Sequence, residues 1–231
     1  MFLTKDNKIQ WKKMCVAAIC VALIVLLGIL WFDKPLFVLL RNFECGLFKL
    51  FGIVFSGKVW LLISFVAAIM LCVKKYLKSE IYFKDKKNNF NLIEGVKNIF
   101  LKTKSSHAFL IFYSVLLTGV IVKFLKVFIG RARPIFFEAL DMTGFYPPSL
   151  DWAFNSMPSG HTAISFAGLV MIGMLIPKYK CVTWSLAILI GFSRIAVGAH
   201  WPSDVILGAF IGMVVADIVK WYMLKNLSNK K

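Results

Sequence analysis

The chain has 231 residues, of which 59% are hydrophobic, and its mean hydropathy is +0.76. This composition excludes an ordinary soluble domain and predicts an integral membrane protein, and the length suits a single domain over residues 1–231. The formal net charge of +17 favours anionic lipids or anionic substrates, and nucleic acid is a poor partner for a chain this apolar.

Apolar runs long enough to cross the roughly 30 Å hydrocarbon layer recur along the chain. The first is Met14–Phe32, and it is followed by Val59–Val73 (extended back through Ile53), Ala108–Ile129, Thr162–Ile176, Cys181 to about Ala199 and Ser203 to about Leu224. Between the first two runs, Asp33–Gly52 mixes charged and apolar residues and predicts a short interfacial helix. We therefore expect an all-α fold, a six-span transmembrane helix bundle with a short interfacial helix between spans one and two.

Lysine residues predict the orientation of these spans. They gather at the N-terminus, in Lys74–Lys104, in Pro177–Lys180 and in the C-terminal tail, which six spans place on one side. The positive-inside rule assigns that side to the cytoplasm, so both termini are cytoplasmic and residues 33–58, 130–161 and 194–202 face outward. The pattern and the compact size favour a multi-pass protein of the bacterial cytoplasmic (inner) membrane, with Lys74–Lys104 contacting anionic lipids.

Polar residues at membrane depth are costly and usually functional, and here they all fall on the outer side. They are Lys126, Arg131, Arg133, Ser159, His161, Arg194, His200 and Asp204. Three of the cations, Lys126, Arg133 and Arg194, would gather around an anion. Arginine presents a fork that suits phosphate oxygens, and lysine acts as a point charge.

The stretch Pro158–His161 opens the fourth apolar run and predicts an anion site. Ser159 is a plausible N-cap, and the free amides and positive dipole end of a helix start favour an anion. Gly160 has no side chain that would keep a phosphate from the backbone. His161 can donate a proton to a leaving oxygen.

A second histidine precedes the last run. Proline favours the first turn of a helix, so the helix should begin near Pro202. Asp204 then lies in the first turn, close enough to orient His200 through a hydrogen bond. A histidine held in one tautomer by a carboxylate can act as a nucleophile.

These residues resemble the signature of the type 2 phosphatidic acid phosphatase (PAP2) family, which also includes acid phosphatases and vanadium haloperoxidases. The resemblance rests on three motifs within residues 126–204: Lys126-x6-Arg133-Pro134, Pro158-Ser159-Gly160-His161 and Ser193-Arg194-x5-His200-x3-Asp204. A single motif would be a weak signal, whereas three complete motifs in order are a strong one.

The resemblance implies hydrolysis of a lipid phosphate, and the predicted orientation places the site on the outer, periplasmic face. His200 would attack phosphorus and form a phosphohistidine, Asp204 would hold His200, and His161 would protonate the leaving group. The phosphoryl group would be bound by Lys126, Arg133, Ser159, Gly160 and Arg194. The family requires no metal, and a ring of three cations would repel one, although two histidines and one aspartate could in principle ligate a metal ion.

Several alternatives remain open at this point. Candidate substrates are phosphatidylglycerol phosphate, undecaprenyl diphosphate, phosphatidic acid and a lipid A phosphate. The same site would also serve a lipid phosphotransferase, and a catalytically silent lipid-binding or transport protein is a third hypothesis, which the complete motifs argue against. The oligomeric state is not predicted.

Other polar residues receive structural interpretations. Lys123 and Arg131 flank the first motif and are interpreted as interfacial anchors rather than as substrate attractors. His107 is interpreted as a solvated surface residue. Asp217 is expected to pair with Lys220, nearly one helical turn further on.

Overall fold

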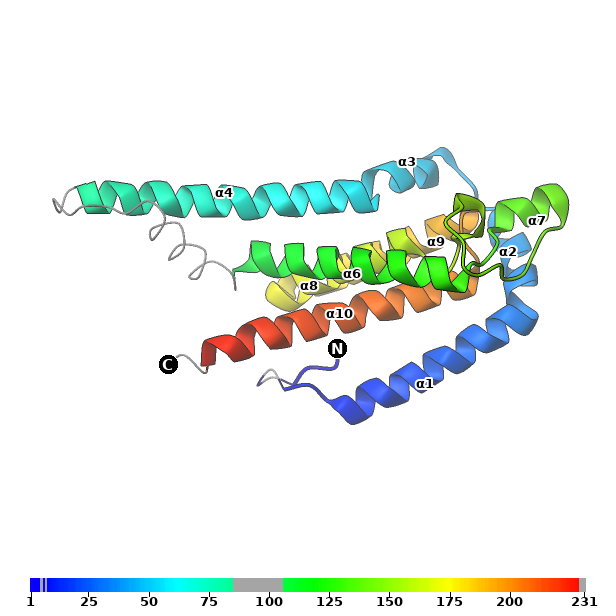
Figure 1. Cartoon of the computed structure of the whole chain (residues 1–231), viewed down its shortest axis with the longest axis horizontal. Coiled ribbons are helices and arrows are strands. Elements are labelled where there is room, and N and C mark those ends of the chain that lie inside the picture. The colour runs from blue at the N-terminus through cyan, green and yellow to red at the C-terminus, as the bar shows by residue number, and fades with distance from the viewer. Residues whose placement is uncertain (5, 7, 85–105, 229–231) are drawn as a thin grey trace.

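The computed structural model describes residues 1–4, 6, 8–84 and 106–228, and these residues form an all-α fold (Figure 1). The long helices are α1 (Trp11–Leu27), α4 (Gly57–Lys84), α6 (His107–Ile129), α8 (Gly160–Leu175), α9 (Lys180–Ala196) and α10 (Pro202–Ser228). The shorter helices are α2 (Asp33–Arg41), α3 (Gly46–Val54) and α7 (Pro134–Leu140), with a π-helical segment at Gly28–Phe32 and 3₁₀ turns at Trp152–Phe154 and Pro177–Tyr179. The predicted all-α class is confirmed.

Four helical segments of the described residues are long and apolar enough to cross a membrane. They are Trp11–Arg41, Gly57–Lys74, His107–Ile129 and Pro202–Lys225. The helices α8 and α9 have 16 and 17 residues, fewer than the roughly 20 that a crossing helix needs. The chain therefore has the segments of a membrane protein, and the count of six spans stays a prediction.

The connection between the first two predicted spans differs from expectation. It contains two helices, because α2 continues from α1 through the π-helical segment and α3 follows as a separate helix. The predicted backward extension of the second span through Ile53 is wrong, since α3 ends at Val54 and α4 begins at Gly57. The interfacial placement of this connection remains a prediction.

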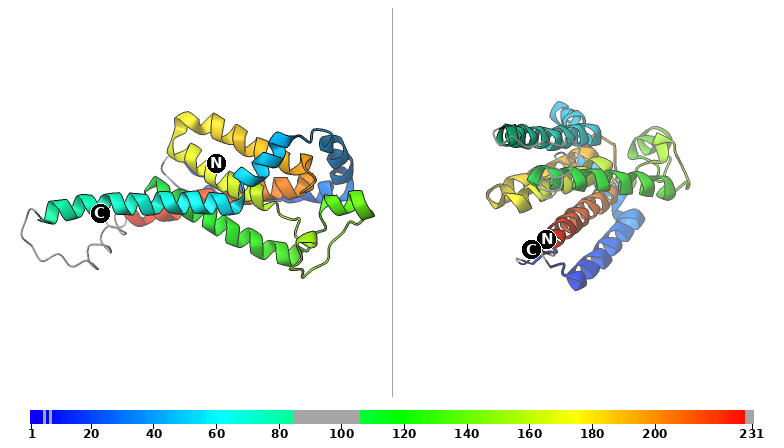
Figure 2. Two further views of the ribbon diagram at one scale, coloured as in Figure 1. Left: turned by 90° about the horizontal axis from the view of Figure 1, so that it is seen from above. Right: turned by 60° about the vertical axis from the view of Figure 1, so that its left-hand side comes forward.

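The helix α8 lies in the middle of the bundle and contacts α4, α6, α9 and α10. Its buried side chains, such as Val170 and Met171, form the main apolar core with Ile190 of α9 and Ala216 of α10. The short helices α2, α3 and α7 gather at one end of the bundle, away from both termini (Figures 1 and 2). Most of the basic stretch Lys74–Lys104 lies outside the described residues.

Two glycines allow α10 to approach α8 closely. A Cβ atom added at Gly208 would lie 2.6 Å from the carbonyl oxygen of Ser159. A Cβ atom at Gly212 would lie 2.9 Å from the amide nitrogen of Ala167. Small residues at this spacing let helix backbones touch. The start of α8 is therefore held directly against α10.

The environment of Asp217 on α10 differs from the prediction. Its carboxylate accepts hydrogen bonds from the Met1 amino group at 3.0 Å and from the Phe2 amide at 2.6 Å. Lys220 instead donates to the carbonyl oxygen of Met174 at 3.2 Å. The predicted pairing of Asp217 with Lys220 is wrong, because the first residues fold back onto α10 and supply the partners of this buried carboxylate.

Candidate active site

The first motif is placed by the end of α6. Gly130 adopts a left-handed conformation with φ of 61° and donates its amide to the carbonyl oxygen of Lys126 at 3.0 Å. Glycine adopts this conformation without strain and commonly ends a helix. The chain then turns, and Arg133 becomes the N-cap of α7 with Pro134 in its first turn. Lys126 and Arg133 are thereby held on either side of a tight bend.

Backbone carbonyls of the connection between α7 and α8 hold the first motif. Lys126 Nζ donates to the carbonyl oxygens of Asn155 at 2.5 Å and Ser156 at 3.1 Å. Arg133 Nη2 donates to the same Asn155 oxygen at 3.2 Å. An ammonium group has three donors, so Lys126 retains one for an anion.

Arg133 is buried and fixed in position by further contacts. Its Nε donates to the carbonyl oxygen of Trp152 at 2.9 Å, its guanidinium lies 4.3 Å from that indole ring, and its Nη1 donates to Ala199 O at 3.0 Å. Two of its five N–H groups are left for a ligand. Burial and the charge of Arg194 lower its pKa to about 10 against the opposing effect of Asp204, so Arg133 is still cationic at neutral pH.

The second motif forms the start of α8, as predicted. Ser159 is the N-cap, but its side chain makes no capping hydrogen bond and its Oγ lies 2.8 Å from Oγ1 of Thr162. The first helical hydrogen bond joins the Ala163 amide to Ser159 O at 3.0 Å, so the amides of residues 160–162 have no partner within the helix. A Cβ atom at Gly160 would lie 3.7 Å from Lys126 Cε. The free amides and the lysine are thus neighbours.

The helix α3 covers His161 and Arg194. His161 Nε2 lies 3.0 Å from the carbonyl oxygen of Gly52, and a Cβ atom at Gly52 would overlap the Arg194 guanidinium. The positive charges of Arg194, Lys126 and Arg133 disfavour the protonated, positively charged form of His161. Arg194 is buried, and within the described residues its Nε has no hydrogen-bond partner.

The third motif places His200 beside Asp204, but without a direct hydrogen bond. His200 Nδ1 lies 3.7 Å from Asp204 Oδ2, which exceeds hydrogen-bond range, so the predicted bond is absent here. The reason is that Oδ2 already accepts the Ser156 hydroxyl at 2.5 Å and the Trp201 amide at 2.9 Å. The two groups remain in close electrostatic contact.

The surroundings of His200 favour its neutral form. Burial lowers the pKa of His200 well below its usual value, and the positive charges of Arg133 and Lys126 lower it further, against the opposing effect of Asp204. A neutral imidazole has a free lone pair and can act as a nucleophile at neutral pH.

Two charged residues near the site were not predicted to be part of it. Arg131 is 6% exposed and Asp33 is 3% exposed, and Arg131 donates to both Asp33 and Asp204. The interpretation of Arg131 as an interfacial anchor is therefore wrong. Two features of the sequence could have indicated their role: Arg131 lies two residues before the motif residue Arg133, and Asp33 directly follows an apolar run.

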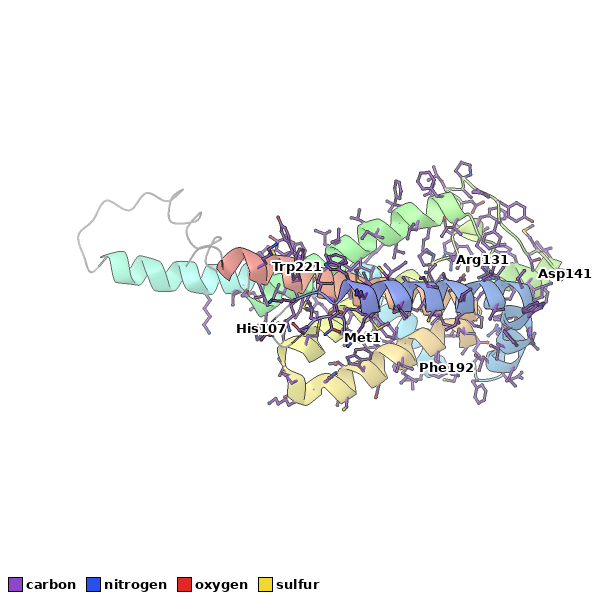
Figure 3. All side chains as sticks on the ribbon, turned by 90° about the horizontal axis from the view of Figure 1, so that it is seen from below. Met1, His107, Arg131, Asp141, Phe192 and Trp221 are labelled. Atoms are coloured by element: carbon purple, nitrogen blue, oxygen red, sulfur yellow. The ribbon has the colours of Figure 1, made fainter. Side chains whose placement is uncertain are left out.

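The labelled side chains in Figure 3 show how the site relates to the rest of the molecule. Arg131 lies toward the end of the bundle that carries Asp141, while His107 lies away from it (Figure 3). His107 is exposed, in agreement with its interpretation as a surface residue. The motif residues lie close to one another, since Lys126 and Arg133 share the Asn155 carbonyl oxygen and His200 Nδ1 lies 3.7 Å from Asp204 Oδ2.

Known proteins resemble parts of this chain. A lipid A 1-phosphatase of Rhizobium johnstonii is 41% identical over 102 residues, which cover 44% of this chain and 42% of that protein. An undecaprenyl-diphosphatase of Sulfolobus acidocaldarius is 41% identical over 58 residues, 25% of this chain and 28% of that protein. Each match thus spans less than half of the relative's own length.

A solved structure and a family profile extend the comparison. The crystal structure of Aquifex aeolicus LpxE has the same fold, with a TM-score of 0.53 and 23% identity over 81% of this chain and 93% of that one. The profile of the PAP2 superfamily matches residues 107–228, which is more than half of the chain and contains all three motifs. The chain therefore belongs to the PAP2 superfamily.

Proposed function

We propose that the chain is an integral membrane lipid phosphate phosphatase that acts through a phosphohistidine on His200. The observation that carries this proposal is a set of anion-binding groups around a neutral histidine. Buried polar atoms normally have partners, yet Arg194 Nε has none within the described residues. Together with the free amides at the start of α8, it suits a phosphoryl group.

In the first step, His200 Nε2 attacks phosphorus. The new P–N bond forms as the bond from phosphorus to the leaving oxygen breaks. His161, which the negative charge of the bound phosphate keeps protonated against the neighbouring cations, gives that oxygen its proton. Nδ1 faces Asp204, so the carboxylate stabilises the positive charge that the ring gains. Lys126, Arg133 and Arg194 stabilise the phosphoryl oxygens, and the preorganised donors require no rearrangement.

In the second step, water releases the phosphate. His161, now neutral, accepts a proton from the attacking water as the P–N bond breaks and the electron pair returns to His200. Ser159 and the Gly160 amide bind phosphoryl oxygens in both steps. Every proton is accounted for by the two histidines and water, and no metal or other cofactor is needed.

Lipid A 1-phosphate is the first substrate to test. The similarity to the rhizobial lipid A 1-phosphatase, 41% identity over 102 residues, supports this choice. Undecaprenyl diphosphate follows, on the similarity to the undecaprenyl-diphosphatase. Phosphatidylglycerol phosphate and phosphatidic acid complete the panel, because the residues of the site indicate that a phosphate group is bound but do not indicate which lipid tail carries it.

We also propose six crossings of the bacterial inner membrane, with cytoplasmic termini and a periplasmic site. Both termini lie away from the end that carries α2, α3 and α7, which supports this arrangement (Figure 1). In a chain whose native cysteines are replaced, Asp141→Cys should react with a membrane-impermeant thiol reagent in cells with a permeabilised outer membrane. Lys178→Cys should react only after the inner membrane is opened, and the reverse pattern would contradict the orientation.

The catalytic proposal is tested by phosphate release from the four lipids in detergent. His200→Ala should abolish release from the substrate, and His161→Ala should reduce it strongly, as losses of catalytic groups do. His107→Ala is the matched control, because it removes the third histidine at an exposed position away from the site. Unchanged release in both site variants would refute the mechanism.

The same assay separates the alternatives. A labelled lipid phosphate that yields free phosphate supports hydrolysis, whereas a new phosphorylated lipid would identify a phosphotransferase. No product from any lipid would support the catalytically silent alternative. Acid-labile phosphate trapped on the wild type and absent from His200→Ala would identify the covalent intermediate.

A further inference from the structure

Arg131 joins two buried carboxylates that come from distant parts of the chain. Its Nη1 donates to Asp204 Oδ1 at 2.7 Å and its Nη2 donates to Asp33 Oδ2 at 2.6 Å. Ser203 completes the cluster. Its hydroxyl oxygen accepts a hydrogen bond from Arg131 Nη1 at 2.7 Å, and its hydroxyl and its backbone amide donate to the Asp33 carboxylate at 2.5 and 2.9 Å. A continuous polar chain therefore runs from Asp33 through Arg131 to Asp204.

The local backbone explains how Asp33 reaches this cluster. The π-helical segment Gly28–Phe32 interrupts the regular helix directly before Asp33. Such π-bulges redirect side chains and are frequent at functional sites. A Cβ atom at Gly28 would lie 3.0 Å from Ser203 Cβ, so a glycine is needed where the first helix meets the start of α10.

Aromatic rings and backbone contacts fix the plane of the Arg131 guanidinium. Its central carbon lies 5.4 Å from the Trp201 ring and 5.5 Å from the Phe145 ring. The Arg131 carbonyl also accepts the Ser156 amide at 3.0 Å. Burial acts to lower its pKa, but Asp204 and Asp33 outweigh that effect and raise it, so the side chain is always charged.

The position of Arg131 on Asp204 determines which carboxylate oxygen faces the histidine. Arg131 occupies Oδ1, and Oδ2 is left on the side of His200, where Nδ1 lies 3.7 Å away. Among the described residues, the hydrogen bonds of the Arg131 side chain go to Asp33, Ser203 and Asp204, and its guanidinium lies over two aromatic rings. It can therefore influence the reaction through Asp204 without touching the substrate.

We infer that Arg131, anchored by Asp33, is a positioning residue that orients Asp204 toward the nucleophile His200. The inference rests on the proposed function of His200. A lone buried carboxylate is strongly destabilised when its counter-charge is removed, so Arg131 also keeps the acidic groups of this cluster compatible with burial. Neither Arg131 nor Asp33 belongs to the three motifs.

The test compares Arg131→Lys and the double variant Arg131→Met/Asp33→Asn with the wild type in detergent. The double variant removes both members of one ion pair, which avoids leaving Asp33 charged without its partner. Arg131→Lys keeps the charge but loses the fork that spans two carboxylates. For folded protein, we expect kcat to fall by about 100-fold in the double variant, with KM unchanged, because a misplaced catalytic group costs rate.

Arg41→Met is the matched control. Arg41 also joins two carboxylates, Glu138 at 2.9 Å and Glu44, but it is 27% exposed and contacts no side chain of the site. The kcat of Arg41→Met should equal that of the wild type. A thermal unfolding midpoint near that of the wild type, measured for each variant, shows that the loss of rate is not a loss of fold.

The outcomes separate this inference from the proposed function. A folded double variant with wild-type kcat would overturn the inference while His200→Ala still abolished activity. A rise in KM as large as that of Lys126→Met would overturn it as well, because Arg131 would then act on the substrate. Full activity of His200→Ala would overturn both. If the double variant does not fold, Arg131→Lys tests the inference by the same criteria. Its kcat is expected to lie between that of the wild type and the value expected for the double variant.

Discussion

The backbone amide of Ser159 donates a hydrogen bond to the carbonyl oxygen of Asp204 at 2.9 Å. This bond joins the second and third motifs directly through the main chain. Gly208, one turn after Asp204, makes room for it, because a Cβ atom there would lie 2.6 Å from the Ser159 carbonyl oxygen.

Gly208→Ala should therefore lower both stability and activity. Its methyl group would push α10 away from Ser159, which moves Asp204 relative to the amides of α8; overpacking of this kind costs about 1–3 kcal/mol. The thermal midpoint and kcat in detergent measure the two effects. Gly119→Ala is the control, since its methyl group would meet only Ile164 at 3.7 Å, and it should match or exceed the wild type.

Lys126→Met should reduce kcat/KM by about 100-fold, the usual cost of removing one group that stabilises transition-state charge. The ammonium is anchored by two carbonyls and lies beside the Gly160 backbone, where the phosphoryl oxygens are proposed to bind. Lys123→Met removes an exposed lysine three residues earlier on the same helix and should leave kcat/KM unchanged. Equal losses in both variants would indicate a general effect of surface charge.

Activity should persist to unusually low pH. The nucleophile must be neutral, and burial lowers the pKa of His200 below the ordinary value of about 6.5. A lowered pKa means that less of the histidine is protonated at any given pH, so the acid limb of kcat/KM caused by His200 should lie below pH 6.5. A profile with its acid limb above that pH would contradict the buried, neutral state of His200.

Gly52→Ala should weaken phosphate binding, because its methyl group would overlap the Arg194 guanidinium and displace either α3 or the arginine. We expect a higher inhibition constant for vanadate, which mimics the trigonal-bipyramidal phosphoryl group, and a higher KM. Gly46→Ala on the same helix has open space around the new methyl group and serves as the control. Wild-type vanadate inhibition in Gly52→Ala would show that α3 moves freely away from Arg194.

Chelation should leave the reaction unaffected, since the proposed steps use two histidines, water and fixed cations. Phosphate release measured with and without an excess of chelator, after prolonged dialysis, tests this expectation. Loss of activity that is restored by a divalent metal would contradict the mechanism. Such a result would point to His161, His200 and Asp204 as metal ligands instead.

The sequence was sufficient to predict the features that depend on local patterns. Apolar runs placed the third helix within one residue of its observed start, His107, and at its observed end, Ile129. Pro202 marked the start of α10 correctly, because proline suits a first helical turn. The motif residues were also predicted to form one site, because their spacing within three separate segments is specific.

Features that depend on tertiary contacts were missed. Arg131 and Asp33 are 98 positions apart, and nothing in their local sequence indicates that they pair. The same holds for the Ser156 hydroxyl, which donates to the Asp204 oxygen nearest His200, where the sequence predicted a hydrogen bond with His200. The pairing of Asp217 was misassigned because nearest-turn partners are the only ones visible in a sequence.

The 16 residues of α8 correspond to a helix about 24 Å long, about 6 Å less than the thickness of a typical hydrocarbon layer. If the far end of α8 reaches the cytoplasmic surface, a phosphate bound at its start would lie below the plane of the surrounding head groups. The proposed phosphatase would then work best where the bilayer is thin or thins locally around it. The length of one central helix would make acyl-chain length, as well as head-group chemistry, a determinant of turnover.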